Sequence, residues 1–80
     1  MTADQILKEL EEIFRDNFDD DDIVLTRETT ADDIEDWDSL EQINLLVAIE
    51  KQFSIKFSLA DVADLENVGS MVDLIEKMIG

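Results

Sequence analysis

The sequence predicts an all-α fold, a small four-helix bundle with a short third helix and a long loop between the first two helices. Apolar residues recur at helical spacing in three segments, and the alternation typical of strands persists nowhere. We find no internal repeat, and a chain of 80 residues is long enough for one domain. We therefore expect residues 1–80 to form a single domain.

The first predicted helix covers about residues 3 to 16. Thr2 followed by Gln5 is the pattern of a capping box, in which each side chain bonds the backbone N–H of the other residue. The apolar residues of this segment share one helix face, as in a helix that packs against a core. They are Ile6, Leu7, Leu10, Ile13 and Phe14.

Residues 17–38 show no periodicity, and the like charges of Asp19–Asp22 would repel one another in any regular element. We predict a long structureless loop that Ile23 and Leu25 anchor to the core. The acidic run does not fit an EF-hand calcium loop. Starts at the nearby aspartates place Phe18 or Ile23 at a ligand position, and the segment contains no glycine. We expect no dedicated metal site.

The second predicted helix runs from Ser39 to about Phe53 and contains neither Gly nor Pro. Asp38 is a typical N-cap residue, and Glu41 follows three residues later as in a capping box, which makes Ser39 the first helical residue. At that position the hydroxyl points to solvent near the positive end of the helix dipole, a favourable place for a phosphate group. The same local features also describe an ordinary first-turn serine.

This second helix carries two apolar stripes. One stripe consists of Leu45, Leu46, Ile49 and Phe53, and the other of Leu40, Ile43 and Val47. Such a helix is either central in its bundle or offers one side to a partner. The bordering residues Asn44, Glu50 and Lys51 indicate a partly exposed patch.

Two further helices are predicted near the C-terminal end. Ser58 followed by Asp61 is expected to cap a third helix of one or two turns, and its apolar residues are Leu59 and Val62. Asn67 is the expected cap of a fourth helix over about residues 68–79. Its inward stripe is Val68, Met71, Val72, Ile75, Met78 and Ile79, with both methionines as core fillers.

The side-chain composition excludes several kinds of chemistry. The chain has no Cys and no His, so it lacks a thiolate nucleophile and an imidazole base, and a serine hydrolase is not expected. A formal net charge of −16 argues against nucleic acid and favours partners with basic surfaces. No apolar run predicts membrane insertion, and no signal pattern opens the chain. We expect a cytoplasmic monomer.

Asp38-Ser39-Leu40, followed by an apolar helix ending in Glu50-Lys51-Gln52-Phe53, resembles the acyl carrier protein family over nearly the whole chain. The resemblance implies a carrier protein that is not an enzyme. In that family a magnesium-dependent phosphopantetheinyl transferase moves 4′-phosphopantetheine from coenzyme A to the motif serine. The arm's thiol then holds acyl, polyketide or aminoacyl intermediates as thioesters. The resemblance thus implies covalent 4′-phosphopantetheine on Ser39, with Asp38 and Leu40 as recognition neighbours.

The acidic start of the second helix is expected to dock acyl-loading, condensing or transferring enzymes that have basic surfaces. The residues predicted for partner recognition are Trp37, Glu41, Ile43, Asn44, Val47 and Glu50. Trp37 either anchors the loop on the bundle or contacts the arm or a docked partner. The chain departs from the common family pattern at Asp36, Asn44, Lys51 and Ser58. The alternative function is an acidic helical protein-interaction module without a prosthetic group.

Overall fold

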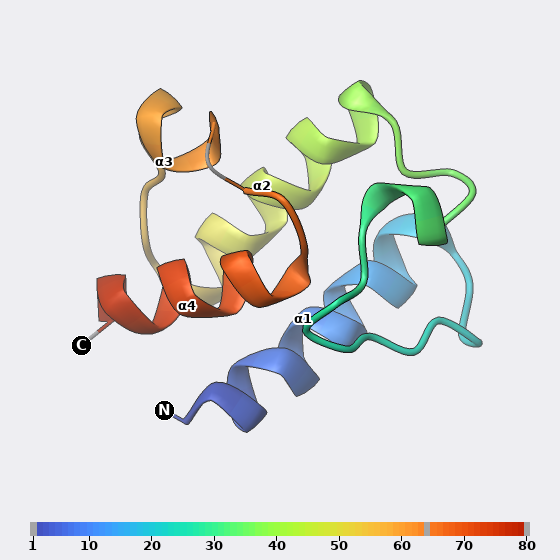
Figure 1. Cartoon of the computed structure of the whole chain (residues 1–80), viewed down its shortest axis with the longest axis horizontal. Coiled ribbons are helices and arrows are strands. Elements are labelled where there is room, and N and C mark those ends of the chain that lie inside the picture. Colours follow the sequence, from blue (N-terminus) through green and yellow to red (C-terminus); the bar gives the residue numbers. More distant parts are fainter. Residues whose placement is uncertain (1, 64, 80) are drawn as a thin grey trace.

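The computed structural model describes residues 2–63 and 65–79 and contains five helical elements in these ranges, with no strand. In chain order they are α1 (Ala3–Phe18), the 3₁₀ turn η1 (Ala31–Asp33), α2 (Ser39–Phe53), α3 (Leu59–Ala63) and α4 (Val68–Ile79) (Figure 1). The all-α architecture with a short third helix and a long first connection is therefore confirmed.

Helix α1 begins at the predicted capping box. The Gln5 N–H donates to Oγ1 of Thr2 at 3.2 Å, and the Thr2 N–H donates to Oε1 of Gln5 at 2.9 Å. The helix ends two residues later than predicted, because Asp19 adopts a left-handed conformation with φ of 51° and its N–H closes the last turn. The first aspartate of the acidic run is therefore a helix cap.

The core lies where α1 packs against both α2 and α4. Its buried residues come from the predicted stripes and from the loop, and they are Ile6, Leu10, Phe14, Ile23, Leu25, Leu45, Ile49, Val68, Met71, Val72 and Ile75. The prediction that Met78 and Ile79 are core residues is wrong, since both are 36% exposed. They form the last turn of α4, at the rim of the bundle, where Met71 in the first turn is buried.

The connection between α1 and α2 is a loop anchored by Ile23 and Leu25, as predicted. Polar contacts to α1 hold the same two residues. The Leu25 N–H donates to Oε2 of Glu11 at 3.0 Å, and Nε of Arg15 donates to the Ile23 carbonyl at 2.8 Å. The prediction of a structureless connection is wrong, because η1 forms within it, with the Thr30 N–H donating to the Asp33 carboxylate at 2.9 Å.

The loop is also bonded to the start of α4. The N–H groups of Val68 and Gly69 donate to the carbonyls of Thr29 and Arg27, each at 2.8 Å. Gly69 is buried, and a Cβ at this position would lie 2.8 Å from the Arg27 carbonyl oxygen. Glycine therefore permits the close approach of loop and helix that holds the second half of the loop in place.

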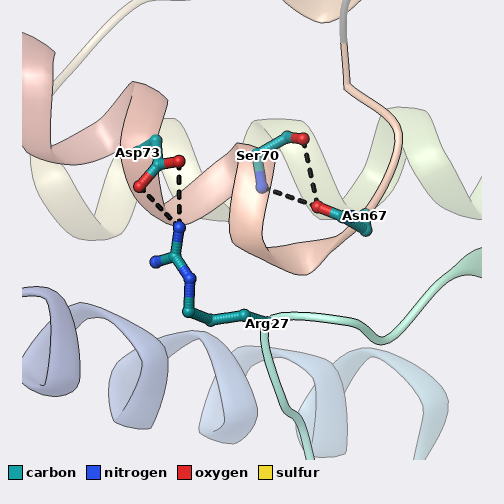
Figure 2. A network of polar contacts seen from close by, with 4 residues as sticks. All are labelled: Arg27, Asn67, Ser70 and Asp73. Carbon is teal, nitrogen blue, oxygen red and sulfur yellow. Dashed lines mark hydrogen bonds and ion pairs between the residues drawn. The ribbon is translucent and has the colours of Figure 1, made fainter.

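Figure 2 shows the polar contacts around this junction. Nη2 of Arg27 contacts both carboxylate oxygens of Asp73, at 2.9 and 3.0 Å. Asn67 caps α4 as predicted, because its Oδ1 accepts hydrogen bonds from the N–H and the hydroxyl of Ser70 at 2.8 and 3.0 Å. The ion pair is solvent-exposed, and such pairs contribute little to stability, so the backbone contacts are the main attachment of the loop.

Helix α3 is a single short turn with the predicted cap. The Asp61 N–H donates to Oγ of Ser58 at 3.1 Å, and the Ser58 N–H donates to the Asp61 carboxylate at 3.0 Å. The backbone N–H of Ser58 is the largest cause of a lowered pKa at Asp61, and the Ser58 side chain is the second. Leu59 on this helix is 88% exposed. Within residues 2–63 and 65–79, no helix has the length and apolar character that a bilayer span requires.

Candidate functional site

The start of α2 is capped by Asp38, as predicted. Its Oδ1 accepts a hydrogen bond of 2.9 Å from the Glu41 N–H. Ser39 is the first residue of the helix, and its side chain is exposed. The reciprocal half of the predicted capping box does not form. The Glu41 carboxylate instead accepts a 2.8 Å hydrogen bond from Nδ2 of Asn17, near the end of α1. Glu41 therefore ties α2 to α1.

The helix start at Ser39 can accommodate an attached phosphate. The first N–H groups of a helix have no acceptor within the helix, and they form the positive end of its dipole. The N–H of Glu41 already donates to the Asp38 side chain, and the N–H of Gln42 donates to the Asp38 carbonyl at 2.9 Å. The N–H groups of Ser39 and Leu40 precede these bonded positions, so a phosphate ester on the Ser39 hydroxyl would lie beside them.

A surface pocket of about 450 Å³ lies beside Ser39. Three segments of the chain form it, namely η1, the start of α2 with the residues before it, and the first turn of α4 with the residues before it. Its lining residues are Ala31, Trp37, Asp38, Ser39, Gln42, Leu65, Glu66, Asn67 and Met71. The lining combines apolar side chains with amides and carboxylates, which suits a flexible ligand that has both methylene and amide groups.

The sequence predicted only three residues of this pocket as site residues, namely Trp37, Asp38 and Ser39. Leu65 and Met71 were indistinguishable from core residues, because both are apolar and one belongs to a regular helical stripe. Asn67 already had an assignment as a helix cap. No local pattern links η1 with the start of α4, since tertiary packing alone brings these segments together.

Trp37 anchors the loop on the bundle, which is the first of its two predicted roles. Its ring packs edge-on against Phe14, with centroids 5.0 Å apart and an interplanar angle of 89°. Its Nε1–H donates a hydrogen bond of 2.6 Å to Oε1 of Gln42. The same half-buried ring lines the pocket beside Ser39, so anchoring and contact with a group on Ser39 are compatible.

The second apolar stripe of α2 faces solvent. Leu40 is 66% exposed, Ile43 59% and Val47 44%, whereas Leu45 and Ile49 on the other stripe are fully buried. Of the two alternatives for this helix, the structure therefore favours a helix that buries one side and leaves the other uncovered.

The other predicted recognition residues divide into two groups. Asn44 is exposed beside Ile43 and Val47 on the uncovered side of α2. Glu50 is half-buried, and its Oε2 accepts a hydrogen bond of 2.8 Å from the Phe57 N–H. Glu50, like Glu41, therefore has a structural contact that the sequence did not predict. No cluster of three metal-ligating side chains occurs in the described part of the chain.

The fold and site define a class of protein, a small helical bundle that presents an exposed serine at a helix start beside a pocket. Residues 5–75 match the family described as phosphopantetheine attachment site. The chain therefore belongs to this family of phosphopantetheine-bearing carrier proteins, which carry a covalent 4′-phosphopantetheine and are not catalysts.

A solved structure supports the same assignment. The solution NMR structure of a holo acyl carrier protein from Geobacter metallireducens matches with a TM-score of 0.87 and 52% sequence identity. The match covers 91% of this chain and 84% of that chain. No curated protein gives a match. At this identity and coverage the similarity to that acyl carrier protein extends to the sequence as well as the fold.

Proposed function

We propose that Ser39 bears the 4′-phosphopantetheine arm and that the arm's thiol holds acyl, polyketide or aminoacyl groups as thioesters. One observation carries this proposal, the exposed Ser39 hydroxyl at the first position of α2, beside the pocket. The other three serines lie in different settings. Ser58 and Ser70 make capping contacts through their hydroxyls, and Ser54 ends α2 in a left-handed conformation.

The arm supplies the chemistry that the chain lacks. With no Cys and no His, the protein has no thiol of its own to form a thioester. In this proposal Asp38 and Leu40 are the neighbours through which a phosphopantetheinyl transferase, acting with coenzyme A and magnesium, recognises Ser39. The capping bond of Asp38 fixes the backbone at the start of α2, and the 66% exposure of Leu40 makes it available to the enzyme.

Charge supports docking at the start of α2. No basic residue lies between Arg27 and Lys51. Eight acidic residues lie between them, namely Glu28, Asp32, Asp33, Glu35, Asp36, Asp38, Glu41 and Glu50. A potential of one sign around Ser39 attracts enzymes that have basic surfaces and raises their association rate. The partners proposed are the transferase and the acyl-loading, condensing or transferring enzymes.

Intact-mass spectrometry tests the attachment. The protein is incubated with coenzyme A, magnesium and a broad-specificity phosphopantetheinyl transferase, and we expect a gain of one phosphopantetheine. Ser39→Ala is expected to abolish the gain, whereas the control Ser54→Gly retains it because glycine suits the left-handed backbone at that position. No gain in the wild-type chain, or a gain that survives Ser39→Ala, would contradict the proposal and favour an interaction module without a prosthetic group.

A further inference from the structure

One side of α2 carries a row of exposed side chains, and the charge of this row changes along the helix. Asp36 and Asp38 are exposed at its start, and Leu40 and Val47 are exposed apolar residues further along. Lys51 follows Val47 by four residues and is also exposed, so it continues the same row. The row is therefore acidic near Ser39, apolar in the middle and basic at the far end.

A hollow of about 330 Å³ at the far end of α2 strengthens the basic character. Val47, Lys51, Ile55 and Lys56 line it, together with Glu50 and Ser54. In the described part of the chain, the two ion pairs involve Arg15 and Arg27 and neither of these lysines. Two ammonium groups against the single carboxylate of Glu50 give this hollow a net positive charge, and that carboxylate is directed to the Phe57 N–H.

The two ends of the row are far enough apart to act separately. Lys51 lies thirteen positions after Asp38, which corresponds to about 20 Å at a rise of 1.5 Å per residue. Exposed charges are largely screened beyond about 8 Å at physiological ionic strength. The overall charge of −16 therefore governs long-range attraction, while Lys51 and Lys56 govern the contact formed at their own end.

We propose that this face docks a partner enzyme whose surface is divided by charge in the complementary way. The partner has basic groups beside Ser39, an apolar seat for Ile43 and Val47, and aspartate or glutamate side chains facing Lys51 and Lys56, about 20 Å from the basic groups. An enzyme with a uniformly basic docking surface would place basic groups against Lys51 and Lys56. This like-charge repulsion disfavours the binding of such enzymes. This inference rests on the proposed function, because the partner enzyme docks here to act on a group that the arm on Ser39 holds.

The test uses a condensing enzyme with a uniformly basic carrier-docking surface as the probe, and its dissociation constant for the phosphopantetheine-bearing chain is measured. A Lys51→Glu/Lys56→Glu variant removes the two like-charge contacts, and we expect it to bind about tenfold more tightly than the wild-type chain. The control variant Lys8→Glu/Lys77→Glu makes the same change in net charge on α1 and α4, and we expect less than about a twofold change.

A second probe enzyme carries glutamate in place of the basic residue that faces the end of α2. We expect it to reverse the order, binding the wild-type chain more tightly than the Lys51→Glu/Lys56→Glu variant. Equal effects of the two double variants on either probe would overturn the proposal, since net charge alone would then explain binding. The intact mass of each variant is measured first. A chain that is not loaded at Ser39 counts against the proposed function, whereas a loaded chain with equal affinities counts against the charge-divided surface alone.

Discussion

The indole of Trp37 and the amide of Gln42 are joined by a 2.6 Å hydrogen bond that spans the start of α2. Trp37 lies two residues before Ser39 and Gln42 lies three residues after it. Both side chains line the pocket beside Ser39, and Phe14 packs against the indole ring. The bond therefore fixes one wall of the pocket next to the proposed attachment point.

Loading of Ser39 should change the fluorescence of Trp37, the one tryptophan in the chain. The ring and Ser39 line the same pocket, so an arm that enters the pocket alters the polarity around the indole. We expect a shift in emission wavelength or intensity between the unloaded and loaded protein, measured at equal concentration. Ser39→Ala treated with the same transferase is the control and should show no change. Identical spectra after loading confirmed by mass would show that the arm stays away from this pocket.

Gly69→Ala should lower the melting temperature. Gly69 is the second residue of α4, so alanine gains at most the about 1 kcal/mol by which it is favoured over glycine in a helix interior, while the new Cβ would lie 2.8 Å from the Arg27 carbonyl oxygen and 3.2 Å from Arg27 Cβ. Displacing the loop backbone costs about 1–3 kcal/mol and strains the Gly69 N–H bond to the same oxygen. We expect the steric cost to exceed the gain, with thermal unfolding followed by circular dichroism.

The exposed position Lys77 in the same helix provides the control for this substitution. Lys77→Ala should change the free energy of unfolding by less than about 0.5 kcal/mol. A melting temperature for Gly69→Ala equal to or above that of the wild-type chain would show that the loop yields easily at Arg27.

The pKa of Asp61 should lie below its ordinary value, chiefly because the backbone N–H of Ser58 donates a hydrogen bond to its carboxylate, with the nearby Ser58 side chain as the second cause. A carboxyl group whose pKa is lower in the folded state stabilises the fold above its unfolded pKa. That contribution is lost as pH falls through the folded pKa, so the cap of α3 should weaken below about pH 4. An NMR titration measures this pKa directly. In Ser58→Ala it should rise part of the way, since the backbone donor remains, and an ordinary pKa in the wild-type chain would contradict the observed cap.

Salt should stabilise the fold. At a net charge of −16 the folded chain repels itself, and salt at 0.1 M reduces this repulsion by shortening the screening length to about 10 Å. We expect the melting temperature to rise with sodium chloride and with magnesium. Asp21→Asn/Asp22→Asn removes two exposed charges and should raise the melting temperature in low salt while reducing its salt dependence. Melting curves that do not respond to either salt would show that self-repulsion is unimportant.

Sequence predicted the helices well because their signals are local. The caps at Thr2, Asp38, Ser58 and Asn67 each bond a backbone N–H three residues later, and such bonds depend on spacing alone. The exposed hydroxyl of Ser39 follows from the same local geometry. The two apolar stripes of α2 allowed two interpretations, a helix central in its bundle or a helix with one side uncovered. The exposure of Ile43 favours the second.

Contacts between segments that are distant in the sequence could not be predicted from residue spacing. Glu41 accepts from Asn17, which is 24 residues away, so its capping role could not be judged from its neighbours. The pocket beside Ser39 is lined by η1, the start of α2 and the segment before α4, which are distant in the sequence. Met78 continues the stripe of α4 in sequence, yet it is exposed because it lies in the final turn at the rim.

Mass spectrometry that locates the modification tests whether Ser39 carries the arm. The loaded chain is digested and its peptides are fragmented, so that the added mass is assigned to one residue. We expect the whole gain in mass to lie on Ser39, at the capped start of α2 beside Trp37. Added mass on Ser54, Ser58, Ser70 or a threonine, with Ser39 unmodified, would contradict it.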